Sequence, residues 1–174
     1  MKLRTFVPAL MLAATSLPAI SAAQVEVTWQ EPDSYTDVRP ANESRKGFRE
    51  RVFRGLDKHF ARMAKVLPDD NTLAVTVTNL DLAGQVWPSS FVGFGHATGS
   101  DVRVIRRIGI PRIEFSYTLT DSTGAVVKSA DVSLKDMGFM DTIASSRYND
   151  QLRYEKHMLQ EWFDEEMSAV VARK

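Results

Sequence analysis

Residues 44–80, SRKGFRERVFRGLDKHFARMAKVLPDDNTLAVTVTNL, contain the clearest change of hydrophobic period in the chain. Apolar side chains first recur every three or four residues with charged ones between them, which is typical of an amphipathic helix of about six turns. These apolar positions are Phe48, Val52, Leu56, Phe60, Met63 and Leu67. From Leu73 the period becomes two, which predicts a half-buried strand over residues 73–80. The stretch therefore predicts a domain that contains both helices and strands.

Shorter patterns on both sides continue this mixed order. Residues 25–29 alternate apolar and polar types and predict a first strand. Residues 112–121 and 125–134 predict a hairpin, because turn-forming residues that include Gly124 lie between them. From residue 152 onward one broad apolar face predicts a second amphipathic helix. Residues 83–101 hold four glycines, one proline and three aromatic residues, and they predict a long loop that can hold a short strand, with a further short strand over residues 102–105.

Together these elements predict a single α+β domain over residues 24–174. A mainly antiparallel sheet with both amphipathic helices packed on one face is the economical arrangement, because each helix has a single apolar face to bury. The length of this segment suits one domain with a proper core. We expect six apolar side chains to share that core: Phe48, Val52, Leu56, Leu159, Trp162 and Phe163.

The N-terminus has the three parts of a secretory signal peptide. Lys2 and Arg4 come first, an apolar run over residues 6–20 follows, and Ser-Ala-Ala at residues 21–23 offers small side chains for cleavage. The run is short and interrupted by two prolines, so it is a poor membrane span, which needs about 20 residues. We expect cleavage after Ala23 and a periplasmic mature chain, with full secretion as the alternative.

Charge and cysteine content narrow the classes of function. Cleavage removes Lys2 and Arg4, which takes the 22 basic residues to 20 against 22 acidic ones, a formal charge of −2. This charge gives no electrostatic case for nucleic-acid binding. The chain has no cysteine, so it forms no disulfide and offers no thiol for a lipid anchor. Beyond the apolar run over residues 6–20, no apolar stretch is long enough to predict a transmembrane segment.

Catalytic and cofactor patterns are weak. There is no Gly-x-Ser-x-Gly elbow, and the glycines at residues 93–99 are spaced one residue too far apart for a dinucleotide-binding loop. His59, His96 and His157 are far apart in the sequence and do not predict a metal site. His59 and His157 fall beside the apolar faces of the predicted helices, where a boundary position is the simpler interpretation. We therefore expect neither a cofactor nor a metal.

The first candidate binding site is the segment over residues 84–100. Trp87, Phe91 and Phe94 would be costly to expose without a use, since each can bury a large apolar area. His96 follows them among glycines, and loops held by a scaffold often carry binding residues. A loop that folds back over the edge of the core would have the same composition, so both interpretations stay open.

The second candidate binding site consists of Arg39, Arg45, Arg153 and Tyr154. These residues lie at or just before the predicted helix starts. Guanidinium groups and helix N-terminal amides can together hold an anion or a carboxylate. The structural alternative is a charged network that fixes a loop to the domain.

Several short motifs resemble a known family. They are RPAN at residues 39–42, SRK at 44–46 before Phe48, RVF at 51–53, PRI at 111–113, LKD at 134–136, and LRYEK at 152–156 before Trp162. In this order they resemble a family of small exported bacterial proteins, the domain-of-unknown-function family 3016. The resemblance implies a single periplasmic domain, and it implies no activity because no functional residues are established for that family.

These observations predict a binding or interaction module of the cell envelope. Its partner would be an envelope protein or a small molecule. Two alternatives stay open: a periplasmic hydrolase that acts through residues 84–100, and a structural accessory subunit of an envelope assembly. Enzymes usually gather several perturbed titratable groups in one cleft, whereas this sequence offers one isolated loop histidine, which favours binding.

Overall fold

The computed structural model describes residues 23–93, 100–141 and 148–172. The elements are β1 (Gln24–Trp29), α1 (Arg45–Met63), the 3-10 helix η1 (Ala64–Val66), β2 (Thr72–Asp81), β3 (Gln85–Pro88), the 3-10 helix η2 (Ser89–Val92), β4 (Asp101–Val104), β5 (Arg112–Thr120), β6 (Val126–Lys135), α2 (Arg153–Glu166) and α3 (Ser168–Val171). No helix within these residues is long and apolar enough to cross a membrane. The predicted site residues Phe94 and His96 lie outside the described part.

Four strands form the main sheet in the order β1-β2-β5-β6. β2 pairs antiparallel with β5, and β5 pairs antiparallel with β6. β1 pairs parallel with β2, which requires a crossover connection, and α1 lies in that connection. The mainly antiparallel sheet is therefore confirmed, with one parallel pair at the β1 edge.

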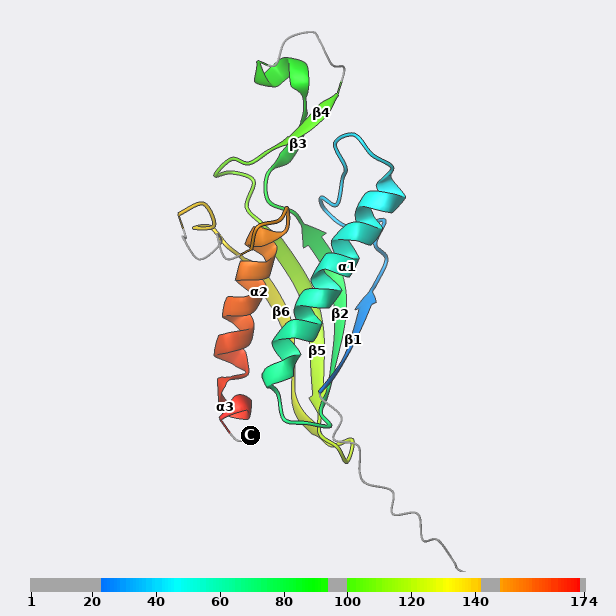
Figure 1. The fold of residues 1–174 in the computed structure, drawn as a ribbon, viewed down its shortest axis with the longest axis vertical. Coiled ribbons are helices and arrows are strands. Elements are labelled where there is room, and N and C mark those ends of the chain that lie inside the picture. The colour runs from blue at the N-terminus through cyan, green and yellow to red at the C-terminus, as the bar shows by residue number, and fades with distance from the viewer. Residues whose placement is uncertain (1–22, 94–99, 142–147, 173–174) are drawn as a thin grey trace, which may run out of the picture.

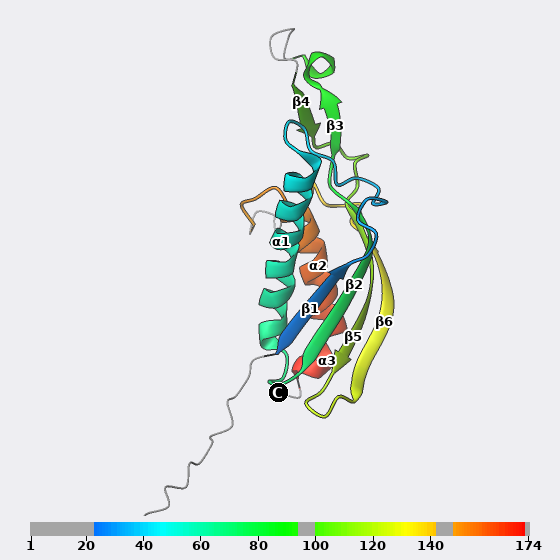
Figure 2. The same ribbon diagram turned by 90° about the vertical axis from the view of Figure 1, so that its right-hand side faces the viewer.

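Both long helices cover the same face of this sheet, as the two views in Figures 1 and 2 show. Along β5 the side chains of Ile113, Phe115, Tyr117 and Leu119 are buried. The six side chains that we expected in the core are buried as well. The single α+β domain with two amphipathic helices on one face is confirmed.

Local chemistry explains where the elements begin and turn. Ser44 caps α1, because its side-chain oxygen accepts a hydrogen bond from the Gly47 amide at 3.1 Å. Gly55 lets the start of α2 approach α1, since a Cβ at this position would lie 2.6 Å from Leu152 Cδ1. Gly124 takes a φ of +84° in the turn between β5 and β6, as its predicted role requires.

β3 and β4 pair antiparallel in a separate two-stranded sheet, and we call β3, η2 and β4 the arm. The arm projects beyond one end of the main sheet (Figure 1). The sequence predicted a long loop here that could hold a short strand, followed by a short strand over residues 102–105, which corresponds to β4. Each strand has only four residues, and strand-forming Val86 and Trp87 are surrounded by turn-forming residues. Val86 pairs with Arg103 and Trp87 pairs with Val102, and this contact between distant segments makes both segments strands.

The buried Trp162 gives the first prediction. Its ring centroid lies 4.8 Å from that of Phe115 and 5.4 Å from that of Tyr117, both in edge-on contact. Trp162→Ala should lower the free energy of unfolding by about 3–5 kcal/mol, because it leaves a cavity between α2 and the sheet. Denaturant unfolding measures this loss, and Glu165→Ala at an exposed position of α2 serves as the control. A loss below about 1 kcal/mol would show that the core does not depend on Trp162.

Candidate binding site

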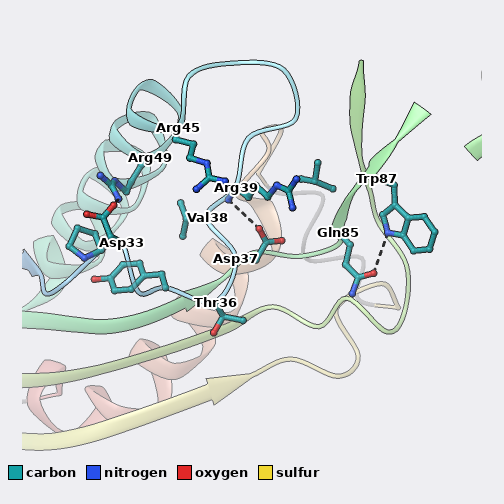
Figure 3. Close-up of a pocket in the computed structure, with 12 residues that line it drawn as sticks. Asp33, Thr36, Asp37, Val38, Arg39, Arg45, Arg49, Gln85 and Trp87 are labelled. Carbon is teal, nitrogen blue, oxygen red and sulfur yellow. Dashed lines mark hydrogen bonds and ion pairs between the residues drawn. The ribbon is translucent and has the colours of Figure 1, made fainter. Parts of the chain in front are cut away.

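A cleft of about 470 Å³ opens at the base of the arm. Its walls are the loop over residues 32–39, the first turns of α1, and β3 (Figure 3). We call it the arm-base cleft. Three predicted site residues meet in it: Arg39 from the loop, Arg45 from α1 and Trp87 from β3. Residues from both sequence-based candidate sites therefore lie together in this cleft.

The other predicted site residues lie elsewhere. Arg153 and Tyr154 line a second hollow of about 740 Å³ between the starts of α1 and α2. There the Arg153 guanidinium lies 5.1 Å from the centroid of the Tyr154 ring, which itself packs edge-on against Phe139. Phe91 is on η2, 75% exposed, and does not line the arm-base cleft.

The two acidic residues of the arm-base cleft are already engaged. Asp33 forms an ion pair with Arg49 of α1. Asp37 forms a two-pronged ion pair with Arg103 of β4, with Nη1–Oδ2 at 3.0 Å and Nη2–Oδ1 at 3.2 Å. Such bidentate pairs are among the stronger charge-assisted contacts.

Arg103 also fixes the backbone around the cleft. Its guanidinium donates to the carbonyl oxygen of Arg39 at 2.8 Å, and to those of Ala83 and Gly84 at 3.3 and 3.4 Å. Arg103 therefore joins the loop of Asp37 and Arg39 to the base of the arm.

Arg39 and Arg45 differ from these paired residues. Both are exposed, and within the described part of the chain neither guanidinium has a hydrogen bond or ion pair. Figure 3 shows the Arg45 side chain reaching from α1 toward Arg39. Like charges that line one cleft repel each other unless an anion balances them. The cleft therefore has an excess of positive charge.

Two aromatic side chains complete the walls. The Tyr35 hydroxyl donates to the Val77 carbonyl oxygen at 2.8 Å, and burial raises the pKa of Tyr35 to about 12, against the opposing charge of Arg49. Tyr35 is therefore a fixed neutral wall at ordinary pH. Trp87 is half-buried on β3, across the cleft from Arg45 (Figure 3), and the Arg106 guanidinium lies 5.2 Å from its ring centroid.

Sequence reasoning missed three contributors to the site. Arg49 lies one turn after Arg45, and this i, i+4 spacing on the predicted helix was a signal that both share a face. Asp37 and Arg103 are 66 residues apart, and no local pattern joins them. Their pairing depends on how the arm sits against the loop.

The histidines that the structure describes do not form a metal site. Among the described residues no three His, Cys, Asp or Glu side chains gather to hold a metal ion. His59 on α1 is only 1% exposed. The expectation that it lies at the boundary of the core is therefore wrong, because the residue is buried. Burial lowers the pKa of His59 to about 4, which keeps the ring neutral in the core at ordinary pH.

Glu155 links α2 to the base of the arm. Its Oε1 accepts a hydrogen bond from the Ala83 amide at 2.7 Å, and the side chain is fully buried. Burial raises the pKa of Glu155 to about 7, although the Ala83 amide favours the charged form. The carboxyl group is therefore held near the point where it gains or loses its proton at neutral pH.

This buried carboxyl group predicts a pH effect. Its pKa rises from 4.5 to about 7 on folding, so the folded protein binds more protons than the unfolded chain between these values. The free energy of unfolding should therefore fall as pH rises through this window, by about 3 kcal/mol in total from this group. Glu155→Gln keeps an acceptor for the Ala83 amide without the charge. The free energy of unfolding of this variant, relative to that of the wild type, should therefore increase from pH 4.5 to pH 8.

Urea unfolding at pH 4.5, 6 and 8 measures that difference. Glu165→Gln, at an exposed position of the same helix, should follow the wild-type pH profile. A Glu155→Gln profile that runs parallel to wild type would contradict the assignment of the raised pKa to this residue.

Comparison with known proteins identifies a family. A family model described as "Protein of unknown function (DUF3016)" matches residues 23–165. The matched range holds strands β1 to β6, α1 and nearly all of α2, so the arm-base cleft lies inside it. No curated protein and no solved structure matches the chain.

Proposed function

The chain belongs to the DUF3016 family, and we propose that it is a binding module of the cell envelope whose ligand presents an anionic group to the arm-base cleft. One observation carries the proposal. Arg39 and Arg45 line the cleft with no acidic partner in the described part of the chain, while Arg49 and Arg103 engage its two acids.

The shape and chemistry of the cleft suit a small organic anion. Guanidinium groups present paired donors that fit carboxylate and phosphate oxygens. A volume of about 470 Å³ is in the usual range of small-molecule sites. Trp87 and Tyr35 offer apolar surface for the rest of such a ligand. Both carboxylates of the cleft are paired with arginines, and Gln85, Val86 and Trp87 of the arm offer neither a nucleophile nor a general base, which favours binding over hydrolysis.

Ligand capture tests this proposal. Wild-type protein purified from the periplasm, or incubated with periplasmic extract, should carry a small anionic molecule that native mass spectrometry detects. An Arg39→Gln/Arg45→Gln variant should lose this molecule, because both unpaired donors are gone.

A matched control is available on the same helix. Lys46→Gln/Arg54→Gln removes the same number of positive charges from α1, but neither residue lines the cleft and both face Glu50 at the surface. This variant should keep the molecule. Wild-type protein that captures no small molecule, or an Arg39→Gln/Arg45→Gln variant that captures the same one, would contradict the proposed function.

Export to the periplasm is part of the same proposal. Its support is the charged start, the short apolar run and the small residues before Gln24. Intact-mass measurement on the periplasmic fraction should give a chain that begins at Gln24. Ala23→Phe, which places a large side chain at the cleavage position, should leave the N-terminal residues attached. A wild-type chain that begins at Met1, or that stays in the cytoplasm, would refute this part.

A further inference from the structure

We infer that the arm-base cleft prefers a small molecule whose anionic group carries two negative charges, as a phosphate monoester does, over one that carries a single charge. This inference rests on the proposed function and names the chemical class of the ligand. It follows from the charges that line the cleft, from the number of donors and from the position of Arg103.

The charge balance of the cleft sets the charge of its ligand. Asp33 and Arg49 neutralise each other within the cleft. Asp37 is neutralised from outside by Arg103, which does not line the cleft. Arg39 and Arg45 remain as the two lining guanidinium groups without an acidic partner. Asp81 lies near Asp37 and Arg103 but does not line the cleft, and the charge of Arg112 opposes its own, so two positive charges are left for a ligand to balance. A singly charged ligand would balance one guanidinium and leave the other unbalanced, whereas a doubly charged ligand balances both.

The donor count points the same way. Each guanidinium can donate two parallel N–H bonds, and Arg39 and Arg45 come from different elements, the loop and α1. A carboxylate has two oxygens, which one guanidinium can already engage. A phosphate monoester offers three terminal oxygens and so accepts from both guanidinium groups at once.

Arg103 preserves this excess charge. Asp37 is two residues from Arg39 in the same loop, and without Arg103 it would be a free acid beside the two unpaired arginines. The ion pair is largely shielded from solvent, since the side chains of Asp37 and Arg103 are each 19% exposed. The bond from Arg103 to the Arg39 carbonyl oxygen also holds the backbone of the residue that faces the ligand. Arg103 is therefore a positioning residue for this site.

Calorimetric titration with phenyl phosphate and phenyl sulfate tests the inference. The two probes share a ring and a tetrahedral anion, but at pH 7.5 phenyl phosphate carries close to two charges and phenyl sulfate carries one. Phenyl phosphate should bind about tenfold more tightly at pH 7.5. The ratio should approach one at pH 5, where the phosphate holds its second proton. Phenyl sulfate reports any effect of pH on the protein itself.

Variants assign the preference to the two arginines. Arg39→Gln and Arg45→Gln should each bring the phosphate-to-sulfate affinity ratio at pH 7.5 close to one, while Lys46→Gln keeps the wild-type ratio. Arg103→Gln should weaken phenyl phosphate binding about tenfold, because Asp37 is released. Adding Asp37→Asn to Arg103→Gln should restore much of the affinity, which loss of structure alone would not allow.

Each outcome has a distinct meaning. Equal affinities for the two probes at pH 7.5, or a ratio that survives Arg39→Gln and Arg45→Gln, would overturn the inference and leave a general anion site. Absence of binding by phenyl phosphate would also overturn it. Ligand capture from the periplasm decides the proposed function separately, because it makes no assumption about the class of anion.

Discussion

The ion pair between Asp37 and Arg103 is the contact on which the arm, the loop and the charge of the cleft all depend. Arg103 sits on β4, pairs with Asp37 in the loop, and donates to the carbonyl oxygens of Ala83 and Arg39. Because the pair is only 19% exposed on each side, loss of one partner would leave a poorly solvated charge. The same contact thus connects the arm to the domain and keeps Asp37 from neutralising the cleft.

The core supplies the second constraint, because it fixes where α1 begins. Phe48, Val52 and Leu56 bury one side of α1 against the sheet, and Ser44 caps its first turn. Arg45 is the first residue of that turn, so the packing of the core determines where its guanidinium can reach. Sites on regular elements are positioned more precisely than sites on loops. Here one helix contributes both to the core and to the cleft.

Much of the fold could be predicted because it follows from local periodicity. A period of 3.6 identified α1, a period of two identified β2, and turn-forming residues identified the hairpin of β5 and β6. The parallel pairing of β1 with β2 and the pairing of β3 with β4 were not predicted, because both depend on contacts between distant segments, although short strands were allowed within and after the predicted loop. Strands of four residues among glycines and a proline carry too little local signal.

The candidate site could be predicted only in pieces. Arg39, Arg45 and Trp87 were singled out for reasons of residue type and position, but in two separate candidate sites. Their meeting depends on how the arm is placed, which no local pattern reports. For the same reason the sequence analysis placed Arg153 and Tyr154 in one candidate site with Arg39 and Arg45. In the structure Arg153 and Tyr154 line a different hollow.

The central claim is that Arg39 and Arg45 act together as the anion-binding groups of the cleft. The most direct test is nuclear magnetic resonance of the arginine side-chain Nε–H groups during addition of phenyl phosphate at pH 7.5. The Arg39 and Arg45 signals should shift together along one saturating curve, while the signal of Arg54 on the far side of α1 should stay in place. Shifts that appear equally at Arg54, or that leave Arg39 and Arg45 unchanged, would contradict the central claim.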